Sequence, residues 1–122
     1  MSITLHLTRD SVAAGDDLDA PHRSTLLLPD DQLTEALVAA IHASGYLPRI
    51  AGGRATWSVV SDRPLAVIAQ QWPEPRMVSG LPHPPEQLRR EAGGYRFHVN
   101  YHVQQDPETV LEVLRRLEPF AR

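Results

Sequence analysis

The sequence contains no cysteine and no lysine, and only 6% of its 122 residues are aromatic. Without cysteine the chain has no disulfide scaffold, no thiolate zinc site and no cysteine nucleophile. All twelve basic residues are arginine, a bias that we attribute to a GC-rich bacterial genome. The core and any functional site must therefore be built from other residue types.

Long apolar runs are also missing. No stretch approaches the roughly 18 apolar residues of a membrane span. The first ten residues, MSITLHLTRD, alternate apolar and polar side chains instead of forming a signal peptide. We therefore expect a soluble protein of the bacterial cytoplasm that does not bind membranes.

A basic charge excess is absent as well. The net charge of −3 argues against a nucleic-acid binder, which normally carries a basic footprint. The charge is uneven: residues 1–35 hold seven acidic residues against two arginines, a net of −5, whereas residues 36–122 carry +2. An acidic amino-terminal third favours a basic partner, although a solvated acidic surface that aids solubility is the alternative.

The overall composition is typical of a single globular domain. A length of 122 residues with 42% hydrophobic and 22% charged residues can bury a single core without disulfides. No internal repeat or low-complexity segment divides the chain. We therefore expect a single domain over residues 1–122.

Periodicity predicts strands and helices along the chain. Period-two alternation predicts a strand in ITLHLTR (3–9), and STLLLP (24–29) reads as a second strand. Helical spacing follows in DDQLTEALVAAIHASG (30–45), with Asp30 or Asp31 as the expected cap and Gly45 as the expected stop. ATWSVV (55–60) and PLAVIAQQ (64–71) are predicted strands. The second is apolar almost throughout, which predicts cover on both of its faces.

The carboxyl-terminal half contains the cleanest pattern. Five prolines between residues 73 and 85 predict a surface excursion. YRFHVNYHV (95–103) alternates strictly and predicts a strand. DPETVLEVLRRLEPF (106–120) predicts a helix with Asp106 as cap and Pro107 in the first position.

These elements predict an α+β fold with a mostly antiparallel sheet of about five strands and two main helices on one face. The order is strand, strand, helix, strand, strand, loop, strand, helix. Its opening part, about residues 2 to 70, resembles a ubiquitin-like β-grasp in element order. That resemblance implies a fold and no activity, because element order does not carry function.

The acidic stretch AGDDLDAPHR (14–23) is the first candidate site. Asp16, Asp17 and Asp19 offer oxygen ligands, but the regular run ending in glutamate that a helix-flanked calcium loop needs is absent. His98 and His102 lie four residues apart, roughly 13 Å along a strand, which is too far to share an ion. We expect no metal and no cofactor, and a strand connection that doubles as a contact surface.

A polar strip is the second candidate. His6 lies on the polar side of the first strand, and Arg96, His98 and His102 lie on the polar side of the last predicted strand. If the two strands are neighbours, these side chains could bind a ligand or supply an acid–base pair. The alternative is an ordinary exposed sheet face. No nucleophile motif is present, so we name no catalytic residue.

We therefore expect a non-enzymatic protein-interaction module. Small, acidic, cysteine-free chains of this build resemble, in general character, the immunity proteins that neutralise bacterial toxins. The expected partner is a protein, and the expected contacts are Asp16, Asp17 and Asp19, with Trp72 beside the proline-rich stretch. The alternatives are a small enzyme or ligand-binding protein using His6, Arg96, His98 and His102, and a homo-oligomer.

Overall fold

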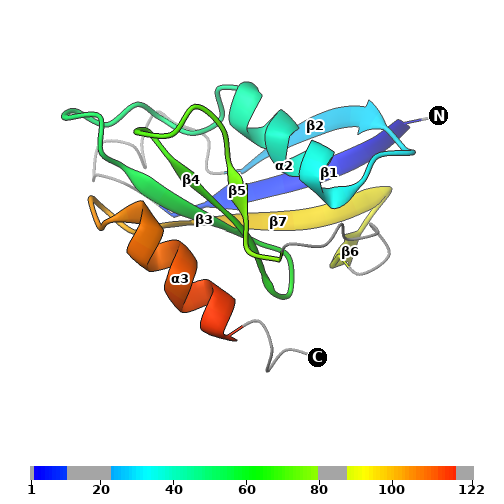
Figure 1. Ribbon diagram of the computed structural model, residues 1–122. Helices are drawn as coiled ribbons and strands as arrows, with labels where there is room; N and C mark the ends of the chain where they lie inside the picture. The colour runs from blue at the N-terminus through cyan, green and yellow to red at the C-terminus, as the bar shows by residue number, and fades with distance from the viewer. Residues whose placement is uncertain (1, 11–22, 80–87, 118–122) are drawn as a thin grey trace.

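The computed structural model describes residues 2–10, 23–79 and 88–117 (Figure 1). These residues form a mixed sheet and two helices, which confirms the α+β class. The strands are β1 Ser2–Arg9, β2 Arg23–Pro29, β3 Thr56–Val60, β4 Pro64–Ala69, β5 Arg76–Met77, β6 Arg90–Glu91 and β7 Gly94–Tyr101, and the helices are α2 Thr34–Ala43 and α3 Pro107–Leu117.

The sheet has the order β2-β1-β7-β3-β4-β5, and β6 pairs with β7 beside this path. Only β1 and β7 are parallel, so the expectation of a mostly antiparallel sheet is confirmed. The described residues form seven strands instead of about five. The two additional strands, β5 and β6, have two residues each, which is too short for an alternating pattern to be visible in the sequence.

The parallel pairing of β1 with β7 places the first and the last described strand side by side within the sheet. Its register places Thr4 opposite Gly94, His6 opposite Arg96 and Thr8 opposite His98. A Cβ atom at position 94 would lie 1.7 Å from the carbonyl oxygen of Thr4. Glycine is therefore required where β7 begins, because any side chain there would push β1 away.

One face of the sheet is covered by α2. The side chains that alternate onto this face from four strands pack with the apolar side of the helix. Trp57 of β3 contacts Tyr101 of β7, with ring centroids 4.6 Å apart. The fully buried members of this core include Leu5, Leu7, Leu37, Val38, Ile41, Trp57, Val59, Phe97 and Val99.

The ends of α2 differ in how well the sequence predicts them. Gly45 has a φ of 79° and ends the helix as expected. The expected aspartate cap is wrong, because the N-cap residue is Leu33 and no side chain caps it. Asp30 and Asp31 instead form the turn that carries the chain from β2 onto the covered face.

The second helix, α3, packs on the opposite face (Figure 1). Val67 of β4 contacts Val110 and Leu111 of α3, whereas its neighbours Ala66 and Ile68 belong to the core under α2. The prediction that both helices share a face is therefore wrong. Its physical reason is β4 itself, whose side chains are apolar on both sides and need cover on both, as its sequence indicates.

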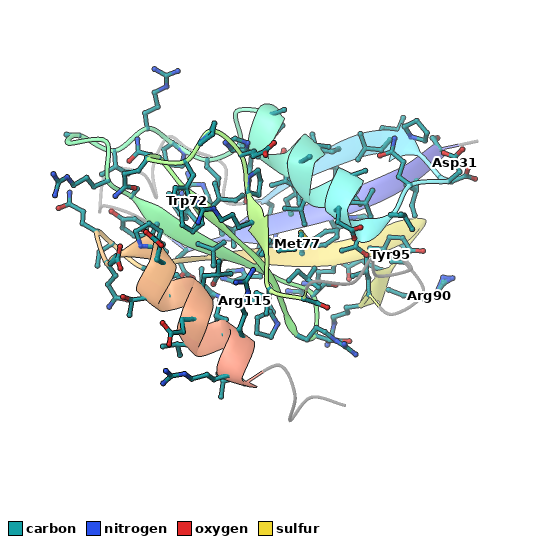
Figure 2. The ribbon with its side chains drawn as sticks, in the orientation of Figure 1. Asp31, Trp72, Met77, Arg90, Tyr95 and Arg115 are labelled. Carbon is teal, nitrogen blue, oxygen red and sulfur yellow. The ribbon has the colours of Figure 1, made fainter. Side chains whose placement is uncertain are left out.

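Hydrogen bonds fix both the start and the side of α3. Asp106 Oδ2 accepts hydrogen bonds from the Thr109 amide at 3.2 Å and from the Thr109 hydroxyl at 2.8 Å, so the predicted cap is confirmed. Arg115 donates from Nε to the carbonyl oxygen of Val78 and from Nη2 to that of Met77, at 3.1 and 3.0 Å (Figure 2). These contacts hold α3 against β4 and β5.

Because α3 lies over β4 and β5, the rest of this face carries no helix within the described ranges. We call this region, the polar sides of β2, β1, β7 and β3, the open face. The open face carries Thr4, His6, Thr8, Asp10, Arg23, Thr25, Ser58, Arg96, His98, Asn100 and His102.

Neither α2 nor α3, the two helices described, has the length and apolar character of a membrane span.

Candidate functional site

The polar strip expected from the sequence is assembled on the open face. The register of β1 and β7 brings His6 beside Arg96 and Thr8 beside His98, so the two strands are indeed neighbours. All four side chains are partly exposed. The strip could form only if these two strands were neighbours, and their pairing meets this condition. The sequence itself could not show that the strands pair.

Two hollows lie on the open face, one on each side of Arg96. The first has a volume of about 470 Å³ and is lined by Arg96, His6, Arg23 and Glu91, together with residues of β1 and β2. The second, of about 400 Å³, is lined by Arg96 and His98 on β7 and by residues between β3 and β4. Arg96 is therefore common to both.

The two hollows differ in charge. In the second, Arg89 forms an ion pair with Asp62 at 3.1 Å. In the first, Arg23 and Arg96 form no ion pair or side-chain hydrogen bond with any described residue. Among the described lining residues, the guanidinium groups of Arg23 and Arg96 face one carboxylate, that of Glu91, so this lining carries an excess of positive charge.

The three histidines of the strip are hydrogen-bonded within the protein. His6 Nε2 lies 2.7 Å from the carbonyl oxygen of Ala92, and His102 Nε2 lies 2.7 Å from the Ser58 hydroxyl. His98 uses both ring nitrogens, Nδ1 with the Thr8 hydroxyl at 2.8 Å and Nε2 with Asp10 Oδ1 at 2.9 Å. These rings join β1, β3 and β7, which is a structural task.

Asp10 completes this network and was not among the sequence candidates. Its Oδ1 bonds to His98, and its Oδ2 accepts the Tyr101 amide at 2.9 Å. Burial acts to raise the pKa of Asp10, but the hydrogen bonds from Tyr101 and His98 and the nearby histidine charges hold it below its usual value. Burial lowers the pKa of His102, although the charge of Asp10 opposes this. Asp10 continues the polar period of Thr4, His6 and Thr8, which is the signal that could have identified it.

The network offers little for catalysis. Ser58 is only 2% exposed, and its hydroxyl is hydrogen-bonded to His102 and, at 3.4 Å, to Asn100. A nucleophile needs access to its substrate, which these contacts deny to Ser58. Among the described residues no group of three or more histidines and carboxylates could hold a metal ion.

The other sequence candidates have different outcomes. Asp16, Asp17 and Asp19 lie outside the described residues. Trp72 is partly buried in the α3 core, and the guanidinium of Arg76 lies 4.0 Å from the centre of its ring (Figure 2). Trp72 therefore anchors the segment around β5, although it also lines a hollow of about 490 Å³. His102 lines none of the hollows described above.

The residues of the strip thus differ in what surrounds them. His98 and His102 serve the network, whereas Arg96 and His6 line the positively charged hollow with Arg23, which the sequence analysis did not single out. No family model, no curated protein and no solved structure matches this chain.

Proposed function

We propose that this chain is a binding module that holds a phosphate or carboxylate group in the first hollow of the open face. The observation that carries the proposal is the pair of arginines, Arg23 and Arg96, which face one hollow without a partner among the described residues. Guanidinium groups match the geometry of both anions through paired hydrogen bonds. A hollow of about 470 Å³ lies within the range of small-ligand sites.

Binding without turnover is favoured by how the neighbouring side chains are used. The ring nitrogens of His98 are both engaged, and His6 is bonded to the Ala92 carbonyl. The backbone of Arg96 is held on both sides, because its N–H donates to the carbonyl of Arg89 at 2.8 Å and its carbonyl accepts the Ser61 hydroxyl at 2.7 Å. These hydrogen bonds fix the backbone of Arg96, so that binding of an anion has to order only its side chain, which limits the entropic cost.

The test is an NMR titration of the ¹⁵N-labelled chain with inorganic phosphate and, separately, with citrate, at constant ionic strength and neutral pH. We expect saturable shifts centred on His6, Thr25 and Arg96, with a dissociation constant of about 1 mM or below. The arm that saturates identifies the anion. If neither anion gives saturable shifts on the open face, the proposal is wrong.

Three substitutions test the site further, because one should lower the affinity for the anion, one should raise it and one should leave it unchanged. Arg96→Gln should weaken binding at least about tenfold, because it removes a charge-assisted contact. Glu91→Gln should tighten binding about threefold, because it removes the opposing charge. Arg54→Gln, which alters an exposed arginine outside both hollows, is the matched control and should have no effect. Equal weakening by Arg96→Gln and Arg54→Gln would reduce the effect to net charge and contradict the site.

A basic protein partner contacted through Asp16, Asp17 and Asp19 stays a prediction, because these residues lie outside the described ranges.

A further inference from the structure

A second arginine, Arg9, lies on the covered face in an unusual environment. It follows Leu5 and Leu7 in the period of β1 that forms the core, and it is only 4% exposed. Its Nε is buried and has no hydrogen-bond partner among the described residues. Buried polar atoms in folded proteins are nearly always paired, so this arginine requires an explanation.

The described surroundings of Arg9 do not supply a full negative charge. Nη1 donates to the carbonyl oxygen of Asp10 at 3.2 Å, and the guanidinium carbon lies 5.8 Å from the centre of the Tyr46 ring. Burial raises the pKa of Tyr46, although Arg9 opposes this, so the phenol stays neutral beside the arginine. No carboxylate of a described residue forms an ion pair with Arg9. A buried charge without a counter-charge is costly.

A hollow of about 370 Å³ adjoins Arg9 at the carboxyl end of α2. Most of its wall is apolar, with Leu26 of β2 on one side and Tyr46 and Pro48 on the other. Ser44 is already committed, because its hydroxyl donates to the Ile41 carbonyl at 2.7 Å and accepts the Tyr46 amide at 3.1 Å. Among its described lining residues, the hollow therefore has one cation and a mostly apolar wall.

We infer that this hollow binds a small organic carboxylate, with the carboxylate on Arg9 and an aromatic or branched aliphatic body against Leu26, Tyr46 and Pro48. One guanidinium balances one negative charge, which fits a carboxylate better than a doubly charged phosphate. An apolar cavity with a single orienting polar group is the usual design of a small-molecule site. The site lies on the opposite side of the sheet from the first hollow and does not depend on the function proposed for it.

The experiment compares phenylacetate with its neutral analogue 2-phenylethanol in NMR titrations of the intact chain. We expect phenylacetate to shift the Arg9 Nε–H resonance and the amides of residues 44–48 saturably. The alcohol should bind at least tenfold more weakly. If the Arg9 Nε–H resonance does not respond to phenylacetate, or if the alcohol binds equally well, the inference is wrong.

Arg9→Met tests the same arginine through binding and stability together. A buried charge replaced by an apolar side chain of similar length should leave the free energy of unfolding unchanged or higher. Phenylacetate affinity should nevertheless fall at least tenfold. Arg54→Gln, which alters an exposed arginine outside this hollow and outside the first, is the control that should leave phenylacetate binding intact. A strong loss of stability in Arg9→Met would show that the chain itself compensates the charge, which contradicts the inference.

Arg9→Lys keeps the charge and removes the paired donors, so it separates the role of the guanidinium geometry from that of the charge. It should weaken phenylacetate binding because lysine cannot form the two parallel hydrogen bonds of a guanidinium. Undiminished affinity in Arg9→Lys would contradict the assigned geometry.

Discussion

The two faces of the sheet are built from the same strands but differ in the burial and polarity of their side chains. On the covered face, side chains such as Phe97 and Val99 are fully buried against α2 and contribute apolar area. On the open face, the alternate residues of the same strand, His98 and Asn100, are partly exposed and hydrogen-bonded to neighbouring strands. The covered face therefore contributes most of the buried apolar area, whereas the polar side chains of the open face stay partly exposed.

The largest expected effect tests whether the covered face carries the stability. Phe97→Ala should lower the free energy of unfolding by about 3–5 kcal/mol, because it leaves a cavity at the centre of the core. Thr25→Ala, at an exposed position of the open face, is the control and should change it by less than about 0.5 kcal/mol. Urea unfolding followed by circular dichroism measures both. Similar losses in the two variants would remove the distinction between the faces.

Local patterns in the sequence account for much of this contrast. The strict alternation in residues 95–103 correctly predicts that Tyr95, Phe97 and Val99 are buried. It is wrong at its end, because β7 stops at Tyr101 and Val103 is 54% exposed. The apolar run of β4 correctly predicts cover on both sides. The parallel pairing of β1 with β7 was not predictable, because it joins segments about 90 residues apart and depends on the whole chain closing around α2. For the same reason the sequence could not show that His6 and Arg96 share a hollow.

Arg9 and Asp10 show what a fuller use of the same pattern would have found. Arg9 occupies the position that the alternation of Leu5 and Leu7 assigns to the core, and a charge in that phase is a signal of a special environment. Asp10 falls in the polar phase and joins the network of His98. Whether such residues bind a ligand or stabilise the fold depends on distances that a linear pattern does not contain.

The next prediction concerns the part of the second face that is covered. Leu111→Ala on α3 should cost about 2–3 kcal/mol, because Leu111 is 4% exposed and packs against β4. The loss should be smaller than for Phe97→Ala, since leucine is smaller than phenylalanine and Leu111 packs in a smaller cluster of buried residues. Val113→Ala, at a 49% exposed position of the same helix, is the matched control and should have little effect. Because alanine has the higher helix propensity, equal losses at positions 111 and 113 would show that packing on β4 is not what distinguishes the two positions.

The smallest effect concerns the hydrogen-bond network of the open face, and its sign follows from two pKa shifts. The pKa of Asp10 is lowered below 3.8 on folding, so the stability it provides is present above pH 4 and lost as the pH falls through the folded value. The pKa of His102 is lowered below 6.5, so the unfolded chain takes up a proton first as the pH falls through that range. Both groups therefore make the folded state less stable toward acid.

Urea unfolding at intervals from pH 3 to pH 8 separates the two contributions. Asp10→Asn should cost about 1 kcal/mol at neutral pH, since it weakens partly exposed hydrogen bonds to His98 and Tyr101, and it should flatten the slope below pH 4. His102→Gln should instead flatten the slope as the pH falls below 6.5, because glutamine does not titrate there. Neither substitution alters the lining of the first hollow, so phosphate or citrate should still bind to a variant that folds. If both variants keep the wild-type pH profile, the network does not control acid stability. Asp10 and His102 would then not have the stabilising role that their hydrogen bonds indicate.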